Sequence, residues 1–65
     1  MMARYTTLLL SDREREVASL VARGLTNREI AAQLILSQRT IDTHVEHIRS
    51  KLGLRSRSQI GALLV

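Results

Sequence analysis

The stretch TNREIAAQLILSQRTIDTHVEHIRSKL, which runs from Thr26 to Leu52, decides the fold of this chain. Thr26 stands three residues ahead of Glu29, so its hydroxyl can accept from the Glu29 amide while the carboxylate reaches back to the Thr26 amide. Ser37 gives a second N-terminal capping signal shortly afterwards, with Thr40 at the third helical position. Two helices that begin so close together leave room only for a tight turn, so the stretch predicts a helix-turn-helix.

The second of these helices carries the most regular apolar pattern in the chain. Its apolar residues recur at spacings of four, three and four: Ile41, Val45, Ile48 and Leu52. Such a pattern makes one narrow apolar stripe. At about 100° per residue, the opposite side carries polar residues of mixed charge: Arg39, Thr43, Glu46, His47 and Ser50. We therefore expect one side of this helix to be buried and the other to be exposed.

Capping signals also mark a helix on either side of this pair. Ser11 and Glu14 form a capping box, which starts a helix that Gly24 can end. Ser56 and Gln59 form another, ahead of a C-terminal helix. The apolar stripe of the first helix is Val17, Leu20 and Val21, and that of the last is Ile60, Leu63 and Leu64, with Val65 beside it. The chain is thus predicted to be all-α, with four helices at about 11–23, 26–35, 37–52 and 56–64.

The chain divides into a short N-terminal piece and one domain. Residues 1–9 show no helical or strand period, so we interpret them as an extension or linker remnant ahead of a domain at 10–65. Leu8, Leu9 and Leu10 are expected to cover one end of its core. The sequence has no apolar run of the roughly twenty residues that span a bilayer, so no membrane contact and a cytoplasmic location are expected.

The charge of the chain favours a polyanionic partner. The formal net charge is +4 and the sequence pI is about 11.2, which is typical of small domains that bind nucleic acid, although basic charge also serves solubility. Residues 37–65 hold most of the excess, with Arg39, Arg49, Lys51, Arg55 and Arg57 against Asp42 and Glu46.

The sequence gives little support for a metal site or an enzyme. His44 and His47 stand three residues apart with Glu46 between them, but this spacing differs from H-E-x-x-H and no third ligand is evident. The chain has no cysteine. Its capping serines have no general base and no oxyanion-stabilising donors beside them in the sequence pattern, so none is a candidate nucleophile. We therefore expect no catalysis, no cofactor and no metal.

Taken together, the segments LSDREREV, GLTNREIAAQLILSQRTIDTHVEHIRSKLGL and SRSQ resemble the LuxR-type (NarL/FixJ-type) DNA-binding domain of bacterial transcriptional regulators. The resemblance covers Leu10 to Val65. It includes polar residues at the family's spacings: Glu14, Thr26, Asn27, Glu29, Ser37, Thr40, His44 and Lys51. It implies a four-helix output module of a larger regulator, which binds duplex DNA in a sequence-specific manner with the helix at 37–52 in the major groove.

The resemblance also implies roles for individual positions. The family's base-reading positions fall on Arg39, Asp42, Thr43 and Glu46, and its phosphate contacts on Asn27, Arg28, Thr40 and Lys51. His47, to which the resemblance gives no role, is a further candidate for a contact with the DNA backbone or groove. Many members carry a basic residue where this chain has Asp42. The carboxylates of Asp42 and Glu46 could accept hydrogen bonds from cytosine N4. Alternatively, Arg39 and Arg49, three residues away, could pair with them and keep them from contacting the bases. We favour the second interpretation.

The C-terminal helix suggests how two copies could bind together. Its apolar face provides the dimer-interface candidates Ile60, Leu63, Leu64 and Val65. A homodimer would bind palindromic or direct half-sites, and it is expected to be weak without DNA because one short helix buries little area. RNA polymerase is a further candidate partner. The alternative function is a protein-interaction module, with the acidic residues of the exposed side turned toward a partner protein.

Overall fold

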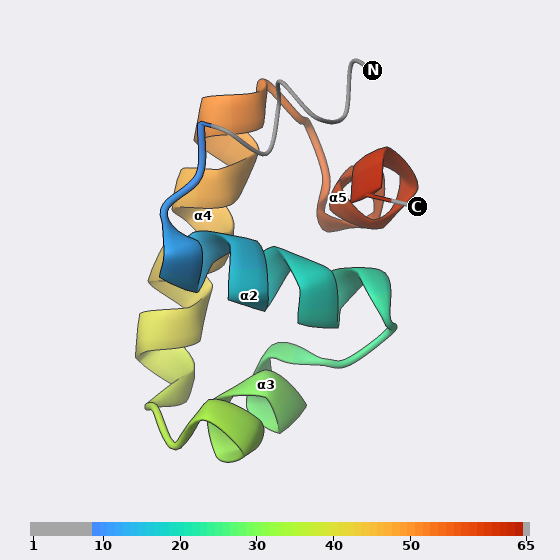
Figure 1. Cartoon of the computed structure of the whole chain (residues 1–65). Coiled ribbons are helices and arrows are strands. Elements are labelled where there is room, and N and C mark those ends of the chain that lie inside the picture. Colours follow the sequence, from blue (N-terminus) through green and yellow to red (C-terminus); the bar gives the residue numbers. More distant parts are fainter. Residues whose placement is uncertain (1–8, 65) are drawn as a thin grey trace.

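Four helices form the part of the chain that the computed structural model describes, residues 9–64, of which Leu64 is described by its backbone only. They are α2 (Asp12–Ala22), α3 (Asn27–Leu34), α4 (Gln38–Leu52) and α5 (Arg57–Leu64). The longest, α4, runs along one side of the molecule, α2 crosses it, and α3 and α5 lie on opposite sides of α2 (Figure 1). The all-α prediction is confirmed. Each predicted span had included the capping residue, so each helix begins one residue later than predicted.

Two capping boxes start α2 and α3, as the sequence predicts. The Glu14 amide donates to Ser11 Oγ at 3.2 Å, and the Ser11 amide donates to Glu14 Oε1 at 2.9 Å. The corresponding distances between Thr26 and Glu29 are 3.1 and 2.8 Å. The bond from the Thr26 backbone amide is the main cause of a lowered pKa of the Glu29 carboxyl.

The caps of the other two helices differ from each other. At α4, the Thr40 amide donates to Ser37 Oγ at 3.1 Å, as predicted. At α5, Gln59 Oε1 accepts from the Ser56 amide at 3.1 Å, but the Ser56 hydroxyl lies 3.1 Å from the Ser58 hydroxyl instead of accepting from the Gln59 amide. That amide donates to the Ser56 carbonyl at 3.3 Å. The predicted capping box of α5 is therefore only half formed.

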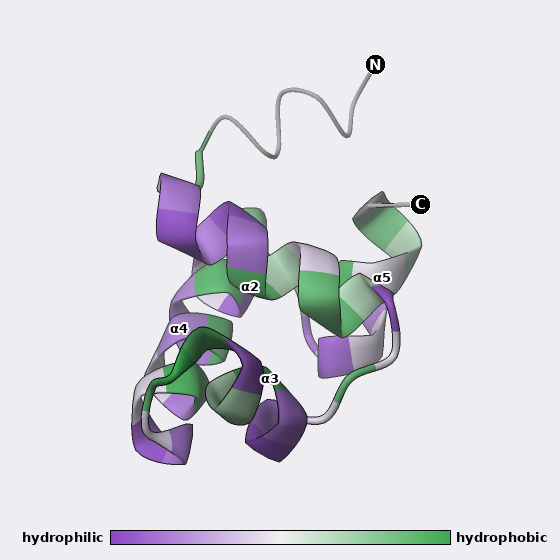
Figure 2. Ribbon diagram, turned by 60° about the horizontal axis from the view of Figure 1, so that its bottom comes forward, coloured by the Kyte–Doolittle hydropathy of each residue, from purple (hydrophilic) through white to green (hydrophobic). Residues whose placement is uncertain are grey.

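The turn between α3 and α4 contains a residue with unusual backbone geometry. Ile35 ends α3 with φ 56° and ψ 51°, in the left-handed region, and its side chain is 89% exposed. A β-branched residue is unfavourable there because its Cβ crowds the backbone. The Leu36 amide donates to the Ala31 carbonyl at 2.9 Å, so the left-handed residue closes α3 where a glycine usually stands. Figure 2 shows that this turn is strongly hydrophobic.

The predicted apolar stripes meet in one core. Its buried members are Leu10, Val17, Ala18, Leu20, Val21, Ile30, Ala31, Ile41, Val45, Ile48 and Ile60. Leu34 and Leu52 are only partly buried at its edge. Of the three leucines expected to cover its end, Leu10 is buried, Leu9 is 59% exposed and Leu8 lies outside the described residues. The prediction is therefore wrong for Leu9. None of the described helices is long and apolar enough to cross a membrane.

Candidate nucleic-acid interface

The two sides of α4 have different environments. Ile41, Val45 and Ile48 are buried in the core, whereas the four candidate base readers, Arg39, Asp42, Thr43 and Glu46, are all exposed. α4 contacts α2, α3 and α5, and the four side chains are exposed in the described part of the chain, so a partner can reach them. The structure thus brings the four candidate readers together on one open helix surface.

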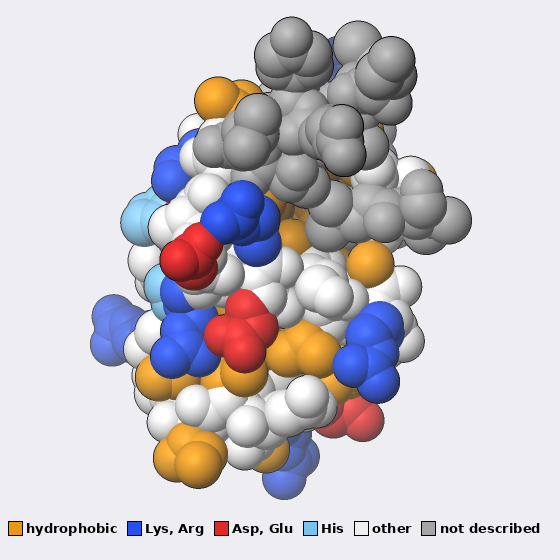
Figure 3. All heavy atoms as spheres, viewed as in Figure 1, with side chains coloured by type: hydrophobic (Ala, Val, Ile, Leu, Met, Phe, Trp, Pro, Cys, Tyr) orange, Lys and Arg blue, Asp and Glu red, His pale blue; other side chains and the backbone are white. Residues whose placement is uncertain are grey.

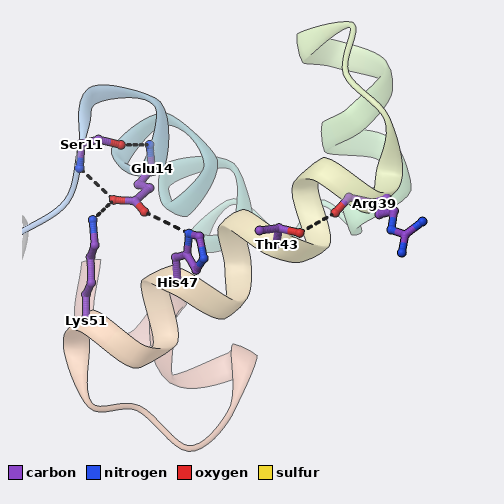
Figure 4. Close-up of polar contacts among 6 residues, drawn as sticks. All are labelled: Ser11, Glu14, Arg39, Thr43, His47 and Lys51. Carbon is purple, nitrogen blue, oxygen red and sulfur yellow. Dashed lines mark hydrogen bonds and ion pairs between the residues drawn. The ribbon is translucent and has the colours of Figure 1, made fainter.

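Arg39 and Thr43 lie one turn apart on the exposed side of α4. Thr43 Oγ1 donates to the Arg39 carbonyl at 3.1 Å, so its proton is used within the helix. The Arg39 side chain points away from the other helices (Figure 4), and among the described residues its guanidinium makes no hydrogen bond or ion pair. Arg39 therefore has a full set of donors available for an external acceptor.

Asp42 is held by a residue of another helix. The Asn27 side-chain amide, at the start of α3, donates to Asp42 Oδ1 at 2.8 Å. Asn27 Oδ1 in turn accepts from Arg57, which also donates to the Leu25 carbonyl. The expectation that Arg39 would hold Asp42 is wrong, because α3 packs on α4 and brings Asn27 within reach of the carboxylate.

Glu46 is held as expected. Arg49 donates to Glu46 Oε1 at 3.3 Å and, through its other terminal nitrogen, to the Arg55 carbonyl at 3.3 Å. The side chain of Arg49 is 33% exposed and that of Glu46 is 66% exposed, so the ion pair itself adds little stability. Its contribution is to keep the Glu46 carboxylate beside a positive charge.

A third acid, Glu14, lies in the contact between α2 and α4. It is only 5% exposed, and its carboxylate receives Lys51 Nζ at 2.6 Å and faces His47 Nδ1 at 3.9 Å (Figure 4). The bond from Lys51 is the largest cause of a lowered pKa of Glu14, followed by the bond from the Ser11 amide, while burial opposes both. Lys51 is thus an ion-pair partner of α2 as well as a candidate phosphate contact.

Sequence reasoning missed this role of Glu14, although a signal for it was present. Glu14 precedes Val17 by three residues and Val21 by seven, so it lies on the apolar stripe of α2. A carboxylate at such a position is buried and therefore needs a charged or hydrogen-bonding partner. The pattern predicts burial and a partner, but it does not identify Lys51.

The remaining phosphate-contact candidates lie on α4 and at the start of α3. Arg28 and His47 are exposed, whereas Asn27 and Thr40 are half-buried and already bonded within the protein, Thr40 to the Ser37 cap. A surface hollow of about 260 Å³ is lined by His47, Ser50 and Lys51. Figure 3 shows basic and acidic side chains interleaved on one face of the molecule, with no uniform basic stripe there.

The dimer-interface candidates do not all lie at the surface. Ile60 is fully buried as a member of the hydrophobic core, so its assignment to a dimer interface is wrong. Leu63 is half-buried. The side chains of Leu64 and Val65 lie outside the described residues. Among the described residues, no group of three or more His, Cys, Asp or Glu could hold a metal ion.

Comparisons with known proteins match this chain over most of its length. The model of the family described as bacterial regulatory proteins, luxR family, matches residues 8–64. A protein of Mycobacterium tuberculosis named as an HTH-type transcriptional regulator is 49% identical over 51 residues, which are 78% of this chain and 6% of that protein. The oxygen regulatory protein NreC of Staphylococcus aureus is 44% identical over 52 residues, 80% of this chain and 24% of NreC. The chain therefore spans only a small part of the length of these relatives.

Proposed function

Because this chain belongs to the LuxR family of bacterial regulatory proteins, a family of DNA-binding regulator domains, we propose that it binds duplex DNA in a sequence-specific manner with α4 in the major groove. The observation that carries the proposal is the exposed side of α4, where Arg39 and Thr43 face outward from a helix whose opposite side is fixed in the core. A helix held in this way can enter the groove without disturbing the fold.

Among the four candidate readers, Arg39 and Thr43 are proposed to contact bases. The Arg39 guanidinium has no partner among residues 9–64 and matches guanine O6 and N7. The Thr43 methyl suits a thymine methyl because the Thr43 hydroxyl is already bonded to the Arg39 carbonyl. Asp42 and Glu46 are proposed to keep their bonds to Asn27 and Arg49 and to make no contact with the bases.

The phosphate contacts are proposed to come from both sides of α4. Arg28 and His47 are exposed and can approach the backbone directly. Lys51 adjoins the hollow beside His47, but Glu14 offsets part of its charge, so it should add less to phosphate binding than an unpaired lysine. Asn27 and Thr40 are assigned as neutral contacts to phosphate oxygens.

Dimerisation through α5 is a second part of the proposal. With Ile60 assigned to the core, the candidate interface is Leu63, Leu64 and Val65. A patch this small is far below a standard interface of about 800 Å² per partner, so pairing should occur on palindromic or direct half-sites and not in the free chain. Sedimentation that shows a single copy on a DNA carrying two half-sites would reject the dimer.

The wider setting of the domain is also proposed. We place the DNA-binding domain at residues 10–65, with residues 1–9 as an extension, in a regulator that acts in the cytoplasm and can contact RNA polymerase. The rival function is a protein-interaction module, which the interleaved charges favour, because two acids on the exposed side of α4 suit a basic partner protein.

Selection of bound duplexes from random DNA at two salt concentrations tests the proposal. DNA binding predicts an enriched motif and an affinity that falls steeply with salt, with a log–log slope of about −0.9 per phosphate neutralised. No enriched motif together with an affinity that does not change with salt would favour the protein-interaction module.

A further inference from the structure

The two acids on the exposed side of α4 are both linked to the start of α5. Asp42 accepts from Asn27 at 2.8 Å, and Asn27 accepts from Arg57, the first residue of α5. Glu46 is joined by Arg49 to the Arg55 carbonyl, in the connection that leads into α5. The first residue of α5 and the connection ahead of it are therefore linked to the candidate reading surface by two chains of polar contacts.

The link through Arg57 fixes the orientation of the Asn27 amide. An asparagine side chain presents an oxygen on one side and an NH₂ group on the other, and the two can exchange by rotation. Because Arg57 donates to Asn27 Oδ1 and to the Leu25 carbonyl with its two terminal nitrogens, the guanidinium fork holds the amide oxygen toward α5. The NH₂ group of Asn27 is then directed at Asp42, as the bond of 2.8 Å shows.

We propose that Arg57 is a positioning residue for DNA recognition. Acting through Asn27, it keeps the Asp42 carboxylate hydrogen-bonded within the protein, so that Asp42 does not contact the DNA bases. This inference rests on the proposed function. Arg57 itself touches no DNA in this account. Without it, Asn27 can rotate, and a free carboxylate beside the groove repels phosphate or accepts from cytosine N4.

A double-mutant cycle on the 65-residue chain tests the proposal. Arg57→Ala is compared with the wild type, and the same change is made in an Asp42→Ala background. The probe is the duplex that the wild-type chain enriches from random DNA, and the readout is its dissociation constant at fixed salt. Arg55→Ala is the matched control, because it removes one positive charge two residues before Arg57 and leaves the backbone carbonyl that Arg49 contacts.

If Arg57 acts through Asp42, Arg57→Ala should weaken binding about three- to tenfold more than Arg55→Ala does. In the Asp42→Ala background this excess should disappear, because no carboxylate remains to be released. Selection with the Arg57→Ala chain should also show a changed preference at one base pair. An equal loss in both backgrounds with an unchanged preference would overturn the proposal, since it would mean that Arg57 contributes only charge or stability.

A second measurement covers the case in which Arg57→Ala does not fold. Asp42→Ala alters an exposed side chain and should leave the fold intact. In the Asp42→Ala chain, Asn27 has lost its hydrogen bond to residue 42, so the guanidinium NMR signals of Arg57, which donates to Asn27, should shift. The guanidinium signals of Arg13 on α2 should not shift. Unmoved Arg57 signals would reject the link. A wild-type chain that enriches no duplex would reject the proposed function itself, whereas binding without coupling in the cycle would reject only the role of Arg57.

Discussion

Glu14 and Asp42 both join α4 to another helix through a carboxylate, but their surroundings differ. Glu14 is 5% exposed; its carboxylate accepts hydrogen bonds from Lys51 and the Ser11 amide, and His47 lies nearby. Asp42 is exposed, and among the described residues it accepts a hydrogen bond only from the neutral amide of Asn27. Burial strengthens electrostatic interactions and makes their loss costly, whereas an exposed bond is weakened by solvent. We conclude that the first contact serves stability and that the second can serve recognition at little cost to the fold.

The largest effect is expected from Glu14→Ala. The change removes the second half of the α2 capping box and leaves Lys51 without its partner, so the free energy of unfolding should fall by about 2–3 kcal/mol. Urea denaturation followed by circular dichroism measures it. Asp42→Ala is the matched control on the exposed side and should cost less than about 0.5 kcal/mol. Equal losses of unfolding free energy in the two variants would contradict the conclusion that the Glu14 contact stabilises the fold more than the Asp42 contact does.

The acid sensitivity of the fold should depend on Glu14. The pKa of Glu14 is lowered in the folded chain. The stability that Glu14 contributes is therefore fully present above the pKa that this carboxyl has in the unfolded chain, and it is lost as the pH falls through its pKa in the folded chain. Melting temperatures measured from neutral to acid pH should therefore fall less steeply in Glu14→Gln than in the wild type. The lowered pKa of Glu29 should leave some acid sensitivity in both chains. Parallel curves would show that Glu14 makes no such contribution.

Arg39→Ala should impair recognition and leave stability nearly unchanged. The loss of a bidentate contact to guanine should reduce discrimination at one base pair by about 1–3 kcal/mol. Competition binding with duplexes substituted at that pair measures the effect, and Arg13→Ala on α2 controls for the loss of one positive charge. If both variants lose affinity equally for all duplexes, Arg39 does not read a base.

Ile35→Gly should stabilise the fold slightly. The backbone of Ile35 is left-handed and its side chain is 89% exposed, so glycine relieves strain and loses little packing, with an expected gain of up to about 1 kcal/mol. Thermal unfolding measures it. Gln33→Gly in the helical part of α3 is the control and should destabilise by about 1 kcal/mol. A loss of stability in Ile35→Gly would show that its side chain makes a contact that offsets the strain.

The smallest effect is expected from Glu46→Gln. The exposed pair with Arg49 contributes little, so stability should change by less than about 0.5 kcal/mol, and affinity for DNA should rise modestly as one negative charge is removed. The selected base preference should stay the same. A changed preference would mean that Glu46 reads a base, as cytosine N4 recognition would require.

Local features of the fold were predictable from the sequence, because they depend on residues close together in the chain. The capping pairs Ser11 with Glu14 and Thr26 with Glu29 span three residues, and the stripe of α4 follows helical periodicity. The left-handed Ile35 was not predictable, since glycine or asparagine usually marks such a position.

The partners within the candidate site depend on how the helices pack, so the sequence alone could not identify them. Lys51 and Glu14 are 37 residues apart, Arg57 and Asn27 are 30 apart, and Asn27 and Asp42 are 15 apart. The exposure of Arg39, Thr43 and Glu46 followed from helical periodicity. The pairing of Glu46 with Arg49 followed from their spacing of three residues. Ile60 was misassigned because an apolar face on a short helix suits a core and a dimer interface equally well.

NMR titration of the labelled chain with its selected duplex shows whether α4 enters the major groove. If α4 enters the major groove, the largest shift changes should fall on the exposed side of α4, at Arg39 and Thr43, and on Arg28 at the start of α3, while the far face of α2 around Arg13 stays unchanged. Changes confined to α5 or α2, or an absence of changes at Arg39 with DNA bound, would contradict recognition by α4.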